Sequence, residues 1–230
     1  MFLLKSCLIT GAGSGLGKEF ALLYSQKGYH VHLAGRNTDK LSAVQQEIEK
    51  AGGAATIHTI DLQQPEAIER LTASFRENGQ NLSRLINNAG IGIFGPFSDM
   101  TLTDIETTFS TNVYGPILLT KACLPLMAEE GTVINIISTA GLRGKKYETI
   151  YCASKFALRG FTESLQKEYE ESSVRFVAAY MGGMNTPFWE DSDYVKDPSG
   201  LPLPKEIAEQ IVREAEDKLE IIIETWGFSF

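Results

Sequence analysis

The chain has 230 residues, of which 43% are hydrophobic, 22% charged and 10% aromatic, and its formal net charge is −8. A chain of this length buries enough surface to fold without disulfides or a metal, and its ordinary apolar content excludes intrinsic disorder. The acidic balance, with no basic patch to oppose it, argues against nucleic acid or an anionic membrane as a partner. We expect an acidic globular protein that binds neither.

Cysteine usage and the start of the chain bear on the compartment. Cys7, Cys123 and Cys152 are odd in number and share no spacing typical of a zinc site or a redox pair, so we expect reduced thiols. The apolar start is interrupted at Lys5, too early for a signal peptide, and no apolar run approaches the ~18 residues of a membrane span. The prediction is a cytoplasmic protein.

Short apolar or β-branched runs alternate with longer amphipathic stretches along the chain. The runs that predict strands are residues 6–10, 31–34, 55–60, 82–86, 132–137, 174–179 and 219–224. The stretches that predict helices are residues 16–27, 38–51, 65–77, 103–127, 150–171 and 204–218. Nearly continuous apolar runs are typical of a parallel sheet covered on both faces. We therefore predict a single doubly wound α/β domain over residues 1–230, with helices on both faces of the sheet.

The first predicted strand runs directly into a glycine-rich turn before the first predicted helix. Four glycines stand within the seven residues from Gly11 to Gly17. The N-terminus of a helix presents unpaired N–H groups and a positive dipole end, which suit a pyrophosphate, and glycine lets the backbone approach it closely. A tight turn without a ligand is the alternative. We favour a dinucleotide site, whose contacts in the turn are Gly11, Ser14, Gly15, Leu16 and Gly17.

The end of the second predicted strand bears on the choice of cofactor. An acidic residue at this place would bind a ribose 2′-hydroxyl, but the sequence has Gly35 followed by Arg36. A guanidinium there can pair with a 2′-phosphate through charge-assisted hydrogen bonds. Arg36 could instead be a solvated surface residue. Its position favours the phosphate role, and with it NADP(H) over NAD(H).

Tyr151 and Lys155 are four residues apart at the start of a predicted helix, so their side chains share one face. A phenol with a pKa of ~10 exchanges protons poorly at neutral pH, and a nearby ammonium stabilises the phenolate. Ser138 follows a predicted strand, where open α/β sheets collect ligand contacts, although it could also cap a turn. These residues are candidates for acid–base chemistry.

Together these motifs resemble those of the short-chain dehydrogenase/reductase family. In the family's order and usual spacings, over residues 5–224, the set is Thr10-Gly-x-x-x-Gly-x-Gly17, Asp61-Leu62, Asn87-Asn88-Ala89-Gly90, Asn112, Ser138 and Tyr151-x-x-x-Lys155. The resemblance implies a Rossmann-like, seven-stranded parallel sheet and a nicotinamide cofactor. It also implies a carbonyl reductase-like activity with a preference for NADP.

The resemblance also implies a role for each matching residue. Tyr151 would donate a proton to a carbonyl oxygen as hydride arrives, and Lys155 would hold the nicotinamide ribose and lower the tyrosine pKa. Ser138 would bind the substrate oxygen, and Asn112 would anchor a water in a proton relay. The further cofactor contacts that it implies are Asp61 and Leu62 beside the adenine, Asn88, Ala89 and Gly90 near the adenosine ribose, and Gly182 and Thr186 at the nicotinamide carboxamide.

Two positions depart from the family pattern. Met181 stands where the family usually has proline, and Ser14 stands where a second basic residue would mark NADP preference. The family resemblance further implies a homodimer or homotetramer, and we expect the apolar residues 226–230 to pack at the subunit interface.

Residues 182–203 form the one long irregular stretch, and we interpret it as a substrate loop or lid. We hypothesise that its aromatic side chains close over an apolar carbonyl substrate, while its acidic ones disfavour anionic substrates. Simple packing of the loop is the alternative. The residues concerned are Phe188, Trp189 and Tyr194, and Glu190, Asp191 and Asp193.

Three histidines, His30, His32 and His58, fall on predicted strands, but no further ligand accompanies them, so we expect structural roles and no metal site.

The predicted function is an NADP(H)-dependent oxidoreductase that interconverts a carbonyl and an alcohol, a small-molecule substrate. A β-ketoacyl-thioester reductase of fatty-acid synthesis would share the site, but the acidic surface disfavours an acidic carrier. A non-catalytic NADP-sensing protein and a sugar-nucleotide epimerase or dehydratase are further alternatives. The complete acid–base set disfavours the sensor, and the short C-terminal region disfavours the epimerase.

Overall fold

Seven parallel strands form one sheet at the centre of the computed structural model, which describes residues 5–190 and 194–224. The strand order is β3-β2-β1-β4-β5-β6-β7. The strands are β1 (Ser6–Thr10), β2 (His30–Gly35), β3 (Ala54–Thr59), β4 (Leu82–Asn87), β5 (Met127–Ile136), β6 (Arg175–Met181) and β7 (Glu220–Ile223). This order reverses direction between β1 and β4, which creates a crevice at the carboxyl ends of these strands.

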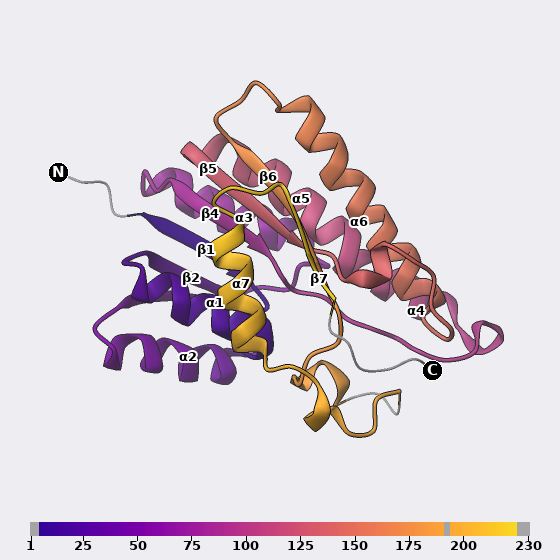
Figure 1. The fold of residues 1–230 in the computed structure, drawn as a ribbon. Helices are drawn as coiled ribbons and strands as arrows, with labels where there is room; N and C mark the ends of the chain where they lie inside the picture. The colour runs from indigo at the N-terminus through magenta and orange to yellow at the C-terminus, as the bar shows by residue number, and fades with distance from the viewer. Residues whose placement is uncertain (1–4, 191–193, 225–230) are drawn as a thin grey trace.

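Helices cover both faces of the sheet (Figure 1). They are α1 (Gly15–Gln26), α2 (Thr38–Lys50), α3 (Pro65–Glu77), α4 (Leu102–Phe109), α5 (Gly115–Cys123), α6 (Thr149–Glu168) and α7 (Pro204–Glu214). The buried residues of α1, α2 and α7 share one core with the sheet, and those of α3, α5 and α6 share a second core on its opposite face. The predicted doubly wound α/β fold with a seven-stranded parallel sheet is confirmed.

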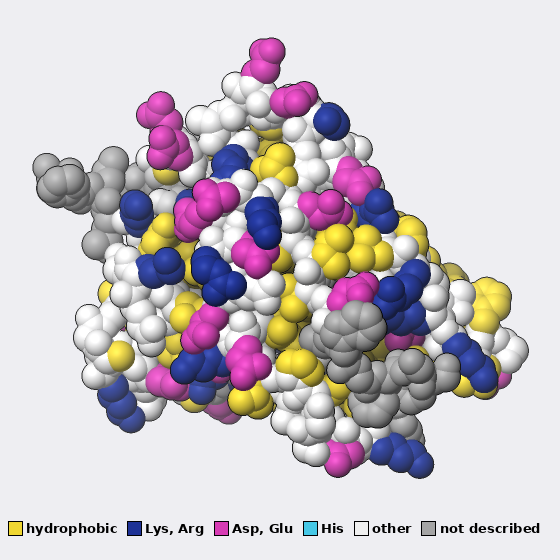
Figure 2. All heavy atoms as spheres, in the orientation of Figure 1, with side chains coloured by type: hydrophobic (Ala, Val, Ile, Leu, Met, Phe, Trp, Pro, Cys, Tyr) yellow, Lys and Arg dark blue, Asp and Glu magenta, His cyan; other side chains and the backbone are white. Residues whose placement is uncertain are grey.

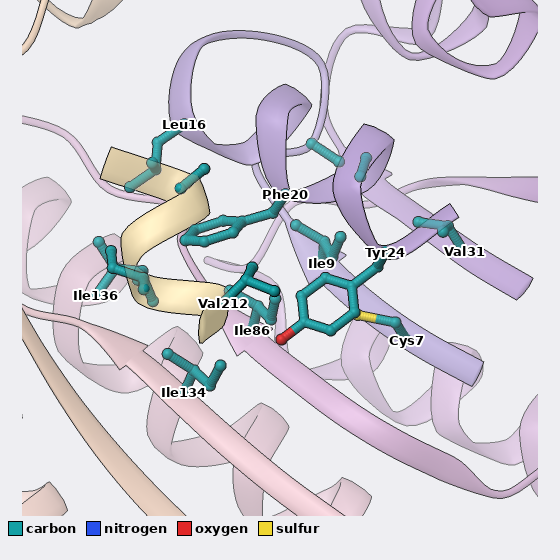
Figure 3. Packing of buried hydrophobic residues seen from close by; sticks show 14 of the residues in the cluster. Cys7, Ile9, Leu16, Phe20, Tyr24, Val31, Ile86, Ile134, Ile136 and Val212 are labelled. Carbon is teal, nitrogen blue, oxygen red and sulfur yellow. The ribbon is translucent and has the colours of Figure 1, made fainter. Parts of the chain in front are cut away.

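The larger core lies between the sheet and the helices α1 and α7 (Figure 3). Phe20 and Tyr24 of α1 are fully buried there beside Val212 of α7, and Ile9 and Ile86 lie beneath them on the strands. Full burial of an apolar side chain such as Phe20 or Ile9 contributes about 1.5–3 kcal/mol. This packing fixes α1, and with it the glycine turn, against the end of β1.

The single helix predicted over residues 103–127 is wrong. The segment forms α4, then a π-helical turn at Ser110–Tyr114, then α5, which ends at Cys123. A short 3₁₀ turn with a proline follows, and β5 begins at Met127 because this residue already pairs with Leu82 of β4. A register shift in that pairing accommodates the polar residues before Thr132.

Residues 182–190 and 194–203 are irregular, as predicted, apart from two 3₁₀ turns at Pro187–Trp189 and Pro198–Gly200. Asp191 and Asp193, which we assigned to the acidic side of this loop, lie outside the described residues, as does the C-terminal segment 226–230.

Within the described ranges, no helix is both long and apolar enough to cross a membrane. Basic and acidic side chains are interspersed on the face shown in Figure 2.

Candidate active site

A cavity of about 460 Å³ lies at the carboxyl ends of the strands, where the strand order reverses. Its volume is in the range of sites that bind small molecules and cofactors. The glycine turn, the end of β2, the loops after β4 and β5, the start of α6 and residues 181–190 all contribute to its wall. Of the predicted site residues, only Gly17 and Asn112 do not line it.

The glycine turn has the backbone that an anion site requires. Gly11 and Gly15 have φ values of +65° and +52°, which L-residues rarely adopt. A Cβ at Gly17 would collide with the Gly11 carbonyl oxygen, so this glycine lets the turn pack on the helix rather than contacting a ligand. The first turn of α1 contains no acidic residue, and the Ser14 side chain makes no capping hydrogen bond. The unpaired N–H groups of this helix end therefore fit a pyrophosphate.

Hydrogen bonds join the glycine turn to the loop after β4. The Thr10 Oγ1 accepts from the backbone N–H groups of Asn88 and Ala89, both at 3.0 Å. The Asn88 Nδ2 donates in return to the Thr10 carbonyl at 2.8 Å. The Asn88 side chain thus holds the two loops together, while Gly90, two residues further on, lines the cavity.

At the end of β2, Arg36 is exposed and lines the cavity, and no hydrogen bond or ion pair engages it within the described residues. Lys40, in the first turn of α2, lines the same region, and its Cβ would be 3.0 Å from a Cβ at Gly13. Lys40 was not among the predicted site residues, although a basic residue four positions after Arg36 at the start of a helix is a recognisable pattern. Asp61 and Leu62, whose predicted place is beside the adenine, line the same cavity.

Tyr151 and Lys155 project from the first turns of α6 and are 8% and 4% exposed. The Lys155 Nζ donates to the Ile136 carbonyl at 3.0 Å and lies 5.6 Å from the centre of the Tyr151 ring. Burial lowers the pKa of Lys155 to about 8. Burial also raises the pKa of Tyr151 above its usual value, and a hydrogen bond with Ser138 acts in the opposite direction.

Ser138 caps a turn and also contacts the catalytic candidate Tyr151, so both roles considered for it from the sequence are present. Its Oγ accepts from the Ala140 N–H at 3.2 Å, which caps the turn after β5, and its side chain also hydrogen-bonds to Tyr151. Its φ of +90° is unusual for a residue with a side chain. Such strained backbone occurs at sites where the surrounding structure fixes a functional group.

Asn112 lies in the π-helical turn between α4 and α5 and is fully buried. Its amide exchanges hydrogen bonds with the backbone N–H and carbonyl of Ile91, both at 2.9 Å, and its Nδ2 donates to the Ser154 Oγ at 3.1 Å. A Cβ at Gly90 would lie 3.4 Å from the Asn112 Oδ1 and 3.5 Å from the Lys155 Nζ. Asn112 therefore lies behind the cavity wall, next to Lys155.

The segment after β6 closes one side of the cavity. β6 continues through Met181, which pairs with Ile223 of β7, and the Gly182 N–H donates to the carbonyl of the same Ile223 at 3.2 Å. Thr186 packs on the glycine turn, since a Cβ at Gly15 would lie 3.2 Å from its side chain. This contact brings the segment next to the proposed pyrophosphate site.

Aromatic rings cover Tyr151. The Phe94 ring lies 5.5 Å from the Tyr151 ring and 4.8 Å from that of Tyr194, and Phe188 lies 5.9 Å from Tyr151. The Trp189 ring stacks on Phe94 at 5.7 Å, and its Nε1 donates to a backbone carbonyl of the same segment at 2.9 Å. Phe94 was not among the predicted site residues, because the sequence around a single aromatic residue in a loop does not predict where its side chain points.

The three histidines lie on β2 and β3, away from the cavity lining. The His32 Nδ1 is 3.0 Å from the His58 Nε2, and the His30 Nε2 is 2.8 Å from the Thr56 hydroxyl. These contacts pack the rings against one another and against Phe75.

The fold and the site together define an oxidoreductase with a Rossmann-like fold. The family model for short chain dehydrogenases matches residues 5–195, and the chain belongs to this family. The sepiapterin reductase of Chlorobaculum tepidum is 31% identical over 215 residues, which cover 90% of this chain and 88% of that protein. The ketoacyl reductase HetN of Nostoc sp. is 29% identical, over 95% of this chain and 78% of HetN. A metagenomic short-chain oxidoreductase solved with NADP is 30% identical and superimposes with a TM-score of 0.81 over 96% of both chains.

Proposed function

We propose that the protein is an NADP(H)-dependent oxidoreductase that interconverts a carbonyl compound and an alcohol, with Tyr151 as the general acid and base. The observation that carries the proposal is the meeting of Tyr151, Ser138 and Lys155 at one wall of a cavity whose other wall is the glycine turn. Fold alone would not justify this activity, because related folds carry many functions.

The nicotinamide, when bound, supplies hydride to the carbonyl carbon or takes it from the alcohol. The Tyr151 hydroxyl gives its proton to the carbonyl oxygen, so that reduction adds one hydride and one proton. The Ser138 hydroxyl hydrogen-bonds to the same oxygen. The Lys155 ammonium, 5.6 Å from the ring of Tyr151, stabilises the phenolate that remains. Asn112 acts as a positioning residue. Its proposed role is still the predicted one, which is to anchor a water molecule in a proton relay.

Basic groups at the end of β2 support the preference for NADP(H) over NAD(H). Arg36 and Lys40 line one region of the cavity, and both carry a charge that can pair with a 2′-phosphate. The Ser14 side chain, free of any capping bond, lies in the same lining and can donate to that phosphate. Lys40 thus replaces the second basic residue that the glycine turn lacks.

The experiment that tests the function measures oxidation of NADPH, and separately NADH, against aldehydes, ketones and β-ketoacyl thioesters. Tyr151→Phe should lower kcat by about 10²–10⁴-fold, the usual contribution of a general acid. Binding of NADPH to this variant, measured by fluorescence titration, should be retained.

Two outcomes would contradict the proposal. Full turnover by Tyr151→Phe would remove the proton donor from the mechanism. Tight NADPH binding without turnover of any carbonyl would favour the sensing protein instead. A preference for β-ketoacyl thioesters would select the alternative suggested by the likeness to HetN.

A homodimer or homotetramer stays a prediction, which light scattering can test.

A further inference from the structure

Glu148 is a buried carboxylate beside Tyr151 for which the proposed mechanism has no use. It immediately precedes α6, is 5% exposed and lines the cavity. It occupies the N-cap position of α6, but its side chain makes no capping hydrogen bond. Buried carboxylates are rare unless they are paired, so this one requires another explanation.

The partners of the Glu148 carboxylate leave part of it free. The Lys145 Nζ is 3.9 Å from the Glu148 Oε2, which is an ion pair but too long for a hydrogen bond. Burial raises the pKa of Glu148, and the charge of Lys145 and a hydrogen bond with Tyr194 act in the opposite direction. Within the described part of the chain, no other hydrogen bond reaches a group that can accept about four, and the Tyr194 hydroxyl also donates to the Lys146 carbonyl at 3.1 Å.

The backbone holds Glu148 in place through a strained residue. Tyr147, just before it, has a φ of +62°, and its carbonyl accepts from the Gly95 N–H at 2.9 Å. A bulky residue in this conformation is an outlier, and such strain is typical of ligand-binding segments. The hydrogen bond ties the segment to the loop that carries Phe94.

A cluster of aromatic rings extends from Tyr194, which hydrogen-bonds to the carboxylate, to Phe188 and Trp189, which line the cavity. Tyr194 and Trp189 both stack on Phe94 with interplanar angles below 30°, at ring distances of 4.8 and 5.7 Å. Planar apolar surfaces of this kind suit a planar ligand. A cationic ligand would be repelled by the ammonium of Lys145 and would lose the hydration of its own charge on binding. A neutral N–H donor avoids both costs and can donate to the unoccupied acceptor sites of Glu148.

We propose that Glu148 selects planar carbonyl substrates that carry a neutral N–H donor, such as an amide, a lactam or an amino group on an aromatic ring. The inference rests on the proposed carbonyl reductase function and names the substrate class of that site. Glu148 accepts the N–H hydrogen bond while the carbonyl oxygen of the same molecule faces Tyr151 and Ser138.

A matched pair of substrates tests this role. An aryl methyl ketone with a ring amino group and its ring-methyl counterpart differ in the N–H donor but little in shape. For the wild type we expect kcat/KM to favour the amino compound by about 10-fold or more, as sites built around a hydrogen bond do. In Glu148→Met, which has a similar length but no oxygen acceptor, this ratio should fall toward one.

Three controls sharpen the test. Glu148→Asp keeps the carboxylate and should retain part of the ratio, and Glu168→Gln, an exposed residue at the far end of α6, should retain all of it. An aminomethyl ketone, which is cationic, should gain no advantage in the wild type. Because the ratio compares two substrates in one enzyme, a change in the Tyr151 pKa or in folding cancels from it.

The outcomes separate this inference from the proposed function. If the wild type reduces the methyl compound and the ratio is the same in the wild type and in Glu148→Met, the selection by Glu148 is refuted and the carbonyl reductase function stands. An advantage for the cationic substrate would also overturn the assignment to neutral donors. If the wild type reduces neither ketone nor any other carbonyl, the proposed function itself fails.

Discussion

Ser138 unites strain and chemistry in one residue. Its φ of +90° costs any residue with a Cβ about 1–3 kcal/mol, a cost that glycine does not carry. Ser138→Ala and Ser138→Gly both remove the hydroxyl that contacts Tyr151, but only the alanine keeps the strain. We expect both variants to lose kcat at least about 10²-fold.

The two variants should differ in stability. In urea unfolding, Ser138→Gly should be more stable than Ser138→Ala by about 1 kcal/mol, because relief of the strain exceeds the extra chain entropy of glycine. Equal stability would mean that the surrounding structure relaxes around the alanine. Unimpaired turnover in either variant would exclude the Ser138 hydroxyl from the mechanism.

Arg36 and Lys40 should determine cofactor choice. Loss of a hydrogen-bonded charge pair costs about 1.5–3 kcal/mol, so Arg36→Ala should raise KM for NADPH by about 10–100-fold and leave KM for NADH nearly unchanged. Lys40→Ala should act in the same direction. Steady-state kinetics with both cofactors measure this, with Arg213→Ala, an exposed arginine of α7, as the control. An equal rise for NADH would assign Arg36 to the shared part of the cofactor.

At the scale of elements, the pairing of β2 with β3 creates a pH-dependent term in stability. Burial, and then the neighbouring His58 and His30, lower the pKa of His32 from 6.5 to about 3. The unfolded chain therefore binds a proton that the folded one does not, and the stability present above pH 6.5 is lost as the pH falls toward 3. Between pH 7 and pH 5 the free energy of unfolding should fall by about 2 kcal/mol through His32.

Urea unfolding at several pH values measures this fall. His32→Leu keeps an apolar side chain in the core and should flatten the pH dependence by that amount, whatever its effect on absolute stability. An unchanged slope in the variant would show that other groups carry the pH dependence.

Elements differ in how far the sequence predicts them. β1 was predictable to the residue because an apolar run ends in a cluster of glycines that is typical of a turn. The break between α4 and α5 was not, because a π-helical turn inserts one extra residue without interrupting the apolar pattern. The early start of β5 depends on a register shift against β4, which only tertiary pairing reveals.

The same distinction holds for the site. Tyr151 and Lys155 were predictable because their spacing puts them on one helix face and the set of motifs around them resembles that of the family. Lys40 and Glu148 line the cavity and Phe94 packs on Tyr151, from three segments that are far apart in the chain. Their directions depend on packing and on the strained turn at Tyr147. No local pattern contains that information.

At the scale of the whole molecule, the cavity lies across a seam in the sheet. The β1 side contributes the glycine turn and Arg36, and the β4 side contributes Ser138 and Tyr151. The Thr10 hydroxyl joins the two sides through the N–H groups of Asn88 and Ala89. A dinucleotide bound across this seam would touch both sides, so binding and the relative placement of the two sides are coupled.

The packing of α7 on α1 has a consequence for synthesis on the ribosome. Phe20 and Tyr24 of α1 are covered by α7, which begins at Pro204, nearly the whole chain later (Figure 3). At about 5–20 residues per second, this face of α1 stays exposed for roughly 10–35 s before its partner emerges. The segment that carries the cofactor turn is thus synthesised long before α7, which completes its packing. Until α7 emerges, the aromatic face of α1 is a target for chaperones.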